Sequence, residues 1–487
     1  MRYCEYKILK SKSPVQELFF NFKEGPLPFL LESSLDVMGM GRYSFFGNDP
    51  FLVLSVQKGR CVISKEGKKE VMEGQPLSIL RELLRTYNLE GNSKTSIPFL
   101  CGAVGFFSYD FGFSLESIKR KNVPDPVVPE LMFAFYDCVT CVDHLKNEVT
   151  VFSSGFPEKG SLREKRAKLR LVSVLKKFKN LHEGRRDKVM PGAFLQRGDL
   201  SSNFSKDQYL TAIRKAKDYI AAGDIYQVNL SQMFKAHMSI EDWALYQRLL
   251  KNFPVAFSAF FSAGGTCLPA RQGSALGGKG EGFSIISASP ERFLYFDGRR
   301  VSTRPMKGTR RRTSDPKINQ ELKRELIQSK KEKAELLMIV DLERNDLGRV
   351  CDYGSIKVKC ARMIEAYANV FQATAEIEGV LHRTKDRLDL IRACFPGGSV
   401  TGCPKIRAME IIEELEPEAR SIYTGSLGYL SFHNTLQLNI LIRSFLKKAD
   451  QIYFNVGGGI VADSKPAAEY EETLIKGRAL MEALKRA

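Results

Sequence analysis

Lys307 is a candidate nucleophile because of its basic surroundings. It lies in the stretch RPMKGTRRR, where its neighbours in the sequence are Arg304, Arg310, Arg311 and Arg312. Neighbouring positive charge disfavours an ammonium ion, so such a lysine gives up its proton more readily, and its free amine can attack carbon near neutral pH. The same stretch is equally consistent with a fixed cation that binds an anionic substrate. The residues alone leave both interpretations open.

Glu335 is an acidic residue with apolar neighbours. It lies in KAELLMIVDL, where helical spacing places Met338, Ile339 and Leu342 on the same side of the helix. A carboxylate in apolar surroundings is costly unless it is protonated, paired or bound to a metal. We therefore expect Glu335 to meet a partner inside a site.

Glu469 and Glu472 form a second group of acids. Their spacing places both on one side of a helix, together with Lys476. Ser464 and Pro466 precede them and predict the cap and first turn of that helix. Acids near a helix start favour the helix dipole, so a purely structural role stays open. If this helix packs against the helix that carries Glu335, the carboxylate oxygens of the two helices together suit Mg²⁺ better than zinc.

Glu291 lies in ASPERF, directly after Pro290 and a strand-like run over residues 283–287. A residue at the end of a strand is well placed for the mouth of a site. By itself, Glu291 would be an ordinary surface acid. Zinc-protease chemistry lacks its ligands, because none of the 5 histidines is paired as HExxH or HxxxH.

The elements that must position these residues are of two kinds. Short apolar or alternating runs dominate the first part of the chain and predict antiparallel strands. Helical patterns mix with strands from residue 205 onward, which favours an α+β fold. The expected strands cover residues 51–56, 71–72, 132–142 and 149–152, and the expected helices cover residues 206–222, 242–252, 319–341, 385–394, 404–415 and 466–484.

We divide the chain into three ranges. Residues 1–155 form a β-rich region, residues 156–200 a basic helix and linker, and residues 201–487 the catalytic domain. Residues 263–282 are rich in glycine and predict a surface loop.

The chain is basic, with 74 Lys and Arg against 56 Asp and Glu. Residues 159–190 hold 12 basic and 3 acidic residues, and helical spacing predicts an amphipathic helix with a basic solvated face. Nucleic-acid binding is the alternative, but no interleaved aromatic residues or known motif accompany the cations. The apolar positions of this helix are Leu162, Leu169, Val172, Leu175 and Phe178.

Composition indicates a globular cytoplasmic protein. Hydrophobic residues make up 43% and charged residues 27% of the chain. No apolar run is long enough to cross a membrane, and the start, MRYCEYKILKSK, has no apolar segment of the signal-peptide kind. The 10 cysteines follow no disulfide framework, so we expect reduced thiols.

Together these segments resemble the chorismate-utilising enzymes, and within them the large subunits of the aminodeoxychorismate synthases. The resemblance covers nearly the whole chain and implies their fold, in which large antiparallel β-sheets form a sandwich flanked by helices. The matching motifs are LLES (30–33), GRYSFFG (41–47), GAVGFFSYD (102–110), GDIYQVNLSQMF (223–234), ASPERF (288–293), RPMKGTRRR (304–312), AELLMIVDLERNDLGRV (334–350), FPGGSVTGCPKIRAMEIIEELEP (395–417), YTGSLGY (423–429), LNILIRS (438–444) and VGGGIVADSKPAAEYEET (456–473).

The resemblance implies a Mg²⁺-dependent site for chorismate. It assigns the metal to Glu335 and Glu472, with Glu469 and Glu332 as acidic support, and the general acid to Glu291. A protonated carboxyl group at that position would help the hydroxyl group at C4 of chorismate to leave.

The substrate contacts are also carried over from the family. The enolpyruvyl carboxylate is assigned to Tyr423 and Arg443, and further contacts fall on Gly308 and Ser399. The groups that line the other carboxylate are Gly457, Gly458, Gly459 and Lys476.

Three positions select a branch of the family. Lys307 matches the lysine of the aminodeoxychorismate synthases, where anthranilate synthases have alanine. Gln227 stands where isochorismate and salicylate synthases have a lysine that activates water, and a neutral amide cannot act as that base. Gln372 stands where the family commonly has a histidine that is associated with pyruvate elimination. The resemblance therefore implies amination of chorismate at C4 without loss of the enolpyruvyl group.

Ammonia has to come from outside this chain. No glutaminase nucleophile motif such as GxCxG is present, so we expect a separate glutamine amidotransferase subunit as the partner. Glu32 and Ser33, in LLES, match the tryptophan pocket of the family's N-terminal region. The alternatives are an anthranilate synthase component I and, from another class, a non-catalytic protein that binds nucleic acid.

Overall fold

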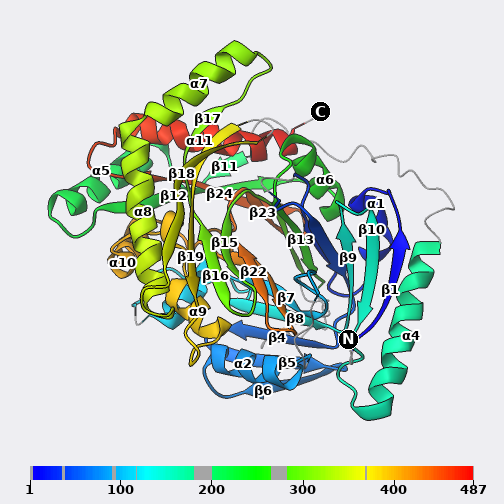
Figure 1. Ribbon diagram of the computed structural model, residues 1–487. Coiled ribbons are helices and arrows are strands. Elements are labelled where there is room, and N and C mark those ends of the chain that lie inside the picture. The colour runs from blue at the N-terminus through cyan, green and yellow to red at the C-terminus, as the bar shows by residue number, and fades with distance from the viewer. Residues whose placement is uncertain are drawn as a thin grey trace.

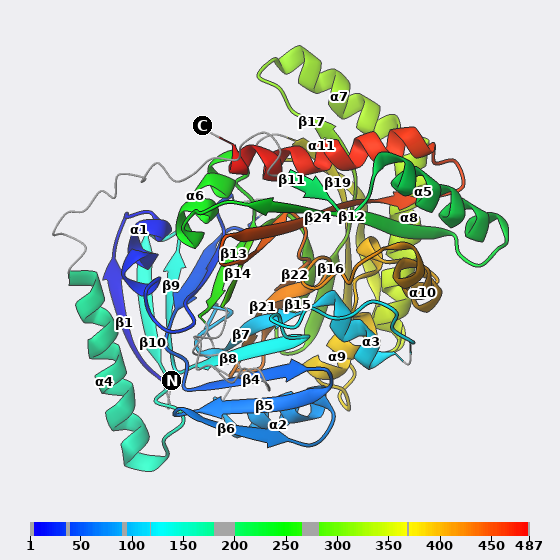
Figure 2. The ribbon, with the colours of Figure 1, turned by 180° about the vertical axis from the view of Figure 1, so that it is seen from behind.

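The computed structural model describes residues 4–35, 39–89, 95–116, 118–179, 200–264, 282–367 and 370–485. Two antiparallel sheets of 12 strands each dominate the structure, and helices surround them (Figures 1 and 2). The predicted α+β class and the expectation of large antiparallel sheets flanked by helices are confirmed.

The first sheet combines strands from both ends of the chain. Its interior strands β2 and β13 are neighbours although they lie far apart in the sequence, and β24 and β12 share the longest register. In order across the sheet the strands are β1 (Glu5–Lys10), β10 (Glu148–Ser153), β9 (Cys138–Asp143), β3 (Tyr43–Gly47), β2 (Phe29–Glu32), β13 (Phe257–Ala263), β14 (Phe283–Ser289), β23 (Ser444–Lys448), β24 (Gln451–Ile460), β12 (Gln227–His237) and β11 (Leu200–Ser202), with β20 (Gly402–Cys403) beside β12.

The second sheet is mixed in the same way. Its strands in order are β17 (Met306–Arg311), β19 (Val370–Val380), β16 (Arg300–Arg304), β15 (Arg292–Phe296), β22 (Leu436–Asn439), β21 (Ser426–Ser431), β7 (Gly102–Phe107), β8 (Leu131–Tyr136), β4 (Leu52–Gln57), β5 (Arg60–Lys65) and β6 (Lys68–Met72), with β18 (Lys357–Ala366) beside β19. Strands from residues 1–155 and from residues 201–487 therefore share both sheets. The boundaries at residues 155 and 200 stay a prediction.

Aromatic side chains join the two sheets. Phe106 of β7 packs edge to face against Phe261 of β13 and Phe283 of β14, with ring centroids 6.1 and 5.8 Å apart. All three side chains are buried, and each contributes about 1.5–3 kcal/mol through burial. This shared core holds the sheets in a fixed relation, which a site built from both of them requires.

Most of the predicted helices are present. They are α5 (Lys206–Ala221), α6 (Asp242–Asn252), α9 (Arg387–Cys394), α10 (Lys405–Leu415) and α11 (Pro466–Leu484). The short helices α1 (Val15–Phe19), α2 (Pro76–Thr86) and α3 (Gly112–Leu115) complete the N-terminal part. No helix among the described residues is both long and apolar enough to cross a bilayer.

The single helix predicted over residues 319–341 is wrong. Two helices occupy this part of the chain, α7 (Pro316–Gln328) and α8 (Lys330–Gly348). Ser329 separates them in an extended conformation, and its side chain accepts a hydrogen bond from the Glu332 amide. A serine in this position is a preferred N-cap, and it starts a new helix here.

The basic segment forms α4 (Gly160–Lys179), but its apolar residues do not all face the protein. Leu162, Leu169 and Val172 are 61%, 63% and 51% exposed, whereas Leu175 and Phe178 pack against the core. The expectation of one buried apolar face is therefore only partly correct. Residues 265–281, most of the glycine-rich segment, lie outside the described residues.

Two arginines of α4 form ion pairs with a buried acid of the protein core. Arg166 and Arg170 pair with the fully buried Asp137 at 3.0 and 3.1 Å. Asp137 separates β8 from β9, so the single strand expected over residues 132–142 is two strands. Part of the positive charge of this segment therefore neutralises a buried acid.

Candidate active site

Glycines of β24 form one wall of the candidate site. A Cβ atom on Gly459 would lie 3.0 Å from Gln227 Nε2 and 3.1 Å from Lys307 Nζ. A Cβ atom on Gly457 would lie 2.9 Å from the Tyr423 hydroxyl oxygen. Glycine is therefore required at these positions, because the side chains approach the bare backbone.

Gly458 borders the acidic part of the site. A Cβ atom there would lie 3.6 Å from both Glu469 Oε2 and Lys476 Nζ. Lys476 also donates a hydrogen bond to the Gly457 carbonyl oxygen at 3.1 Å. The glycines of β24 thus lie next to Lys476 and Glu469 of α11, and the binding role that the resemblance assigns to them stays a prediction.

Lys307 lies on the edge strand β17 with its amine among charged groups. Burial lowers its pKa, the carboxylates of Glu335, Glu291 and Glu472 oppose this effect, and Lys476 adds to it. No side chain in the described part of the protein forms a hydrogen bond or ion pair with the Lys307 amine. The amine is therefore held without a fixed partner and is easier to deprotonate than an ordinary lysine.

The cause of this lowered pKa differs from the expected one. The neighbouring arginines point to acids and carbonyl groups: Arg304 pairs with Glu365, and Arg310 pairs with Glu332 at 2.7 Å. Arg312 donates to the Tyr367 carbonyl oxygen. The prediction of crowding by arginines is therefore wrong, and desolvation takes its place.

Glu291 lies between β14 and β15 and is 4% exposed. Burial raises the pKa of its carboxyl group to about 7, against a lowering by Ser399 and Lys307. Ser399, in the turn Gly398–Val400, donates a hydrogen bond to Glu291 Oε1 at 2.7 Å. A carboxyl group with this pKa is partly protonated at neutral pH and can deliver a proton.

The acids of α8 and α11 face each other. Lys331 lies between the two helices, with its Nζ atom 3.8 Å from Glu335 and 3.6 Å from Glu469. Glu472 pairs with Lys476 at 2.8 Å. Lys331 was missed in the sequence, although its spacing of four from Glu335 predicts an ion pair on one side of a helix.

The surroundings of Glu335 are charged and not apolar as expected. Burial raises the pKa of Glu335, Lys307 and Lys331 lower it, and Glu472 and Glu469 raise it further. On α8, Glu335 points toward these charged groups, whereas Leu336 and Ile339 are buried in the core. The cap prediction also differs: Lys465 is the N-cap of α11, and Ser464 instead donates a hydrogen bond to Glu469 at 2.6 Å.

The donor set of these acids suits a hard cation. Carboxylates that raise one another's pKa repel each other, and a divalent ion with oxygen ligands would relieve this repulsion. Among the residues that the structure describes, no three His, Cys, Asp or Glu side chains are already arranged as a metal site. Glu335, Glu469 and Glu472 are therefore the residues that could hold Mg²⁺, and the metal stays a prediction.

Gly308 follows Lys307 in a conformation that favours glycine, with φ of +84°. A Cβ atom there would lie 3.0 Å from the Glu332 carboxylate and 3.1 Å from Leu326. Glu332 pairs with Arg310 through one oxygen, and its other oxygen is buried without a hydrogen bond. Gly308 thus lets this part of β17 pack closely under α7 and α8.

Arg443 and Tyr423 are two further residues of the candidate site. Arg443 has a φ of +52°, and its side chain forms no hydrogen bond or ion pair with the described residues. Burial lowers its pKa, and Glu291 and Tyr367 oppose this. Burial raises the pKa of Tyr423 to about 12, so its hydroxyl stays protonated. A half-buried cation without an anion is suited to bind a carboxylate ligand.

Two glutamines near Lys307 have unsatisfied polar atoms. Both amide atoms of Gln227 and the Oε1 atom of Gln372 are buried without a hydrogen bond. Gln372 lies on β19, opposite Thr309 of β17 and Glu365 of β18. Buried polar atoms without partners are costly, so a ligand that supplies those partners would be favoured here.

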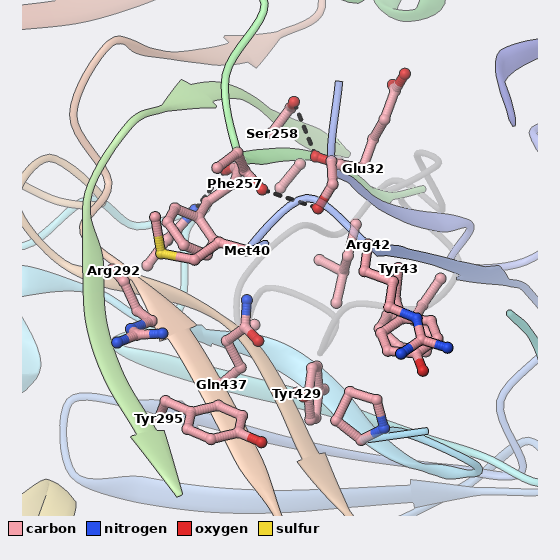
Figure 3. A pocket seen from close by; sticks show the side chains of 18 of the residues that line it. Glu32, Met40, Arg42, Tyr43, Phe257, Ser258, Arg292, Tyr295, Tyr429 and Gln437 are labelled. Carbon is pink, nitrogen blue, oxygen red and sulfur yellow. Dashed lines mark hydrogen bonds between the residues drawn. The ribbon is translucent and has the colours of Figure 1, made fainter. Parts of the chain in front are cut away.

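Glu32 and Ser33 lie apart from these groups. They line a cavity of about 360 Å³ (Figure 3) together with aromatic side chains such as Tyr43, Phe257 and Tyr429. Tyr246 donates a hydrogen bond to Glu32 at 2.7 Å, and burial raises the pKa of this carboxyl group. Its use for tryptophan stays a prediction.

Comparison with known proteins places this arrangement in a family. The model of the chorismate binding enzymes matches residues 43–482. Aminodeoxychorismate synthase component 1 of Escherichia coli is 35% identical over 95% of this chain and 94% of its own. Anthranilate synthase component 1 of Cereibacter sphaeroides is also 35% identical, over 93% of this chain and 88% of its own.

Solved structures agree with the sequence relatives. Anthranilate synthase component I of Streptococcus pneumoniae is similar with a TM-score of 0.76 and 27% identity, over 92% of this chain and 93% of its own. The menaquinone-specific isochorismate synthase of Escherichia coli shares the fold with a TM-score of 0.70 and 16% identity, over 99% of this chain and 95% of its own. The chain belongs to the family of chorismate binding enzymes.

Proposed function

We propose that this chorismate binding enzyme is the large subunit of an aminodeoxychorismate synthase, which converts chorismate and ammonia to 4-amino-4-deoxychorismate and water. The observation that carries the proposal is the Lys307 amine, which is desolvated, has no fixed partner and lies among the charges of Glu291 and Glu335. Relatives of both the aminodeoxychorismate and the anthranilate branch are 35% identical, so the branch rests on the site and not on overall similarity.

The reaction divides into two displacements. In the first, the neutral Lys307 amine forms a bond to C2 of the chorismate ring, both ring double bonds shift by one position, and the C4 hydroxyl leaves as water with the proton of Glu291. In the second, ammonia forms a bond to C4, both double bonds shift back, and the neutral Lys307 amine is expelled, while the new C4 ammonium group returns a proton to Glu291. The enolpyruvyl group is kept throughout.

Other residues bind and orient the substrate. Arg443 and Tyr423 bind the enolpyruvyl carboxylate. The ring carboxylate is bound next to Lys476, Gly457 and Gly458. Ser399 holds Glu291 through its hydrogen bond of 2.7 Å. Glu335, Glu472 and Glu469 would hold Mg²⁺, whose positive charge, when bound, neutralises a substrate carboxylate and stabilises charge that develops in the reaction.

The second candidate is an anthranilate synthase component I. The anthranilate synthase relative is as similar to this chain in overall identity as the aminodeoxychorismate synthase relative, and a solved anthranilate synthase shares the fold. Lys307 and Gln372 argue against it, since the resemblance associates alanine and histidine at these positions with that branch. The two activities differ in product, because only anthranilate formation releases pyruvate.

Mass spectrometry of the products tests the proposal. The purified chain is incubated with chorismate, Mg²⁺ and ammonium, beside Lys307→Ala and the control Arg311→Ala, an exposed cation on the same strand. We expect aminodeoxychorismate without pyruvate, lost in Lys307→Ala and kept in Arg311→Ala. Anthranilate with pyruvate would replace the proposal by the second candidate, and full activity of Lys307→Ala would reject the covalent route.

A further inference from the structure

Helix α7 projects from the protein body next to the candidate site. Figures 1 and 2 show it beyond the other helices, directly after β17 and before α8. Only its C-terminal end is anchored: Leu326 is fully buried, and Arg362 donates a hydrogen bond to the Ile327 carbonyl oxygen at 3.0 Å. The N-terminal half of α7 therefore presents its side chains to the outside.

An apolar stripe on α7 runs from the core to the solvent. Ile318, Leu322 and Leu326 repeat every four residues and lie along one side of the helix. Leu326 is buried, Leu322 is partly buried and Ile318 is 46% exposed. No part of the described chain covers the outer end of this stripe.

The surface around α7 is positive. Residues 310–333 contain nine Lys and Arg residues against four Asp and Glu residues. Two of the acids, Glu325 and Glu332, already pair with Arg310, and Asp315 is used as the N-cap of α7. Lys331 pairs with Glu335 and Glu469, and Arg312 donates to the Tyr367 carbonyl oxygen, so the positive charge that faces an acidic partner comes from α7 itself, from Lys317, Lys323 and Arg324.

The open side of the candidate site lies at the base of α7. Lys331 and Glu472 have half-exposed side chains, at 50% each, and Lys476 is 43% exposed. Lys307 lies on the strand that leads into α7, and Glu335 lies on the helix that follows it. A protein bound to α7 would therefore cover the solvent side of the catalytic groups.

We propose that α7 is the docking arm for the subunit that supplies ammonia. The partner surface that fits it is acidic and carries an apolar pocket for Ile318. Docking here would release ammonia beside Lys307 and Glu335 and would limit its loss to solvent. This inference rests on the proposed function, because it needs an enzyme that consumes ammonia.

Helix α4 offers a matched surface at a distance from the site. It is also basic, and it also exposes apolar side chains, among them Leu169 at 63%. In both views α4 lies at the opposite edge of the protein from α7 (Figures 1 and 2). A partner on α4 could not cover the catalytic groups, so α4 supplies the control.

The test uses the double variant Lys317→Glu with Ile318→Asp. Both positions are in the first turn of α7, where acids favour the helix dipole, so the helix itself is not weakened. The control is Lys168→Glu with Leu169→Asp in α4. The probe is a purified glutamine amidotransferase subunit that supports glutamine-dependent turnover by the unaltered chain, with its affinity measured by calorimetry.

We expect the α7 variant to bind this subunit at least about tenfold more weakly and to lose glutamine-dependent turnover at limiting subunit. Turnover with ammonium should stay unchanged, which separates docking from catalysis. Unchanged affinity, an equal loss in the α4 control, or an unaltered chain that uses ammonium but takes ammonia from no amidotransferase would overturn the docking arm.

Two further results have distinct meanings. A dimer of the unaltered chain that dissociates in the α7 variant, seen by sedimentation, would assign the arm to a second copy and overturn the proposal. Absence of turnover with ammonium in the unaltered chain would instead reject the proposed function itself.

Discussion

The candidate site and the cavity at Glu32 differ in the ion pairing of Lys307 and Arg443 on one side and of Arg42 and Arg292 on the other. In the site, the side chains of Lys307 and Arg443 form no ion pair with any described residue. In the cavity, the cations have acidic partners: Arg42 pairs with Asp143 at 2.8 Å and Arg292 with Glu376 at 3.2 Å. Unpaired charge is costly to bury, so it is kept where a charged substrate can compensate it.

The two regions meet at the start of β15. Glu291 belongs to the site, and Arg292, the next residue, lines the cavity. Glu291 lies just before β15 and Arg292 is the first residue of this strand, so the start of β15 lies between the candidate site and the cavity.

The largest loss is expected for Lys307→Met, which keeps the length of the side chain and removes the amine. If Lys307 is the nucleophile, amination stops with ammonium as well as with glutamine, because methionine has no amine that could form the bond to C2. Product formation by mass spectrometry is the measurement. Arg311→Met is the control, and a residual activity that equals that of the unaltered chain would show that Lys307 only fixes charge.

Glu291→Gln should lower kcat by about 10²- to 10⁴-fold, the usual contribution of general acid catalysis. The unaltered enzyme needs this carboxyl group protonated, and burial raises its pKa to about 7, so the rate should fall as pH rises through about 7. The Lys307 amine must be neutral to attack, so its protonation limits the rate on the acid side of the profile, and burial, which lowers its pKa, moves that limb to lower pH than for an ordinary lysine. A profile whose alkaline limb is the same in Glu291→Gln would assign that limb to another group.

The sequence predicted the residues of the site better than their environments. Motif matching found Lys307, Glu291, Glu335 and the glycines of β24, because each is needed for a close approach or a charge. It could not show that Lys307 is desolvated by the folded chain, since neighbours in the sequence alternate sides on a strand and point away.

The fold shows the same limit. The periodic patterns predicted α6 and α11 with their observed bounds, Asp242–Asn252 and Pro466–Leu484. They failed at Ser329, where one side-chain hydrogen bond divides a continuous helical pattern into α7 and α8. Caps and buried ion pairs depend on tertiary contacts, so they are difficult to predict from spacing alone.

Ser399→Ala tests how the site holds its acid. The mutation removes the hydrogen bond of 2.7 Å to Glu291, which stabilises the carboxylate that forms as the acid gives up its proton. A hydrogen bond to a charged group is worth about 1.5–3 kcal/mol, so kcat should fall by about 10- to 100-fold. Ser399 lowers the pKa of Glu291, so its loss should move the alkaline limb of the rate profile to higher pH. A fall in kcat without this shift would mean that Ser399 acts on the substrate alone.

Glu32→Gln should have the smallest effect on catalysis, and it tests whether the cavity at Glu32 is independent of the candidate site. If the cavity binds L-tryptophan, the ligand raises the melting temperature of the unaltered chain, because it binds only the folded state. The Glu32 carboxylate could pair with the ammonium group of an amino acid, and the amide variant removes this charge, so the rise should shrink while kcat with ammonium stays nearly constant. Lys307→Met should show the reverse, with the thermal shift intact and turnover lost. Equal losses of both properties in either variant would mean that the start of β15 couples the two regions, and their separation would then be wrong.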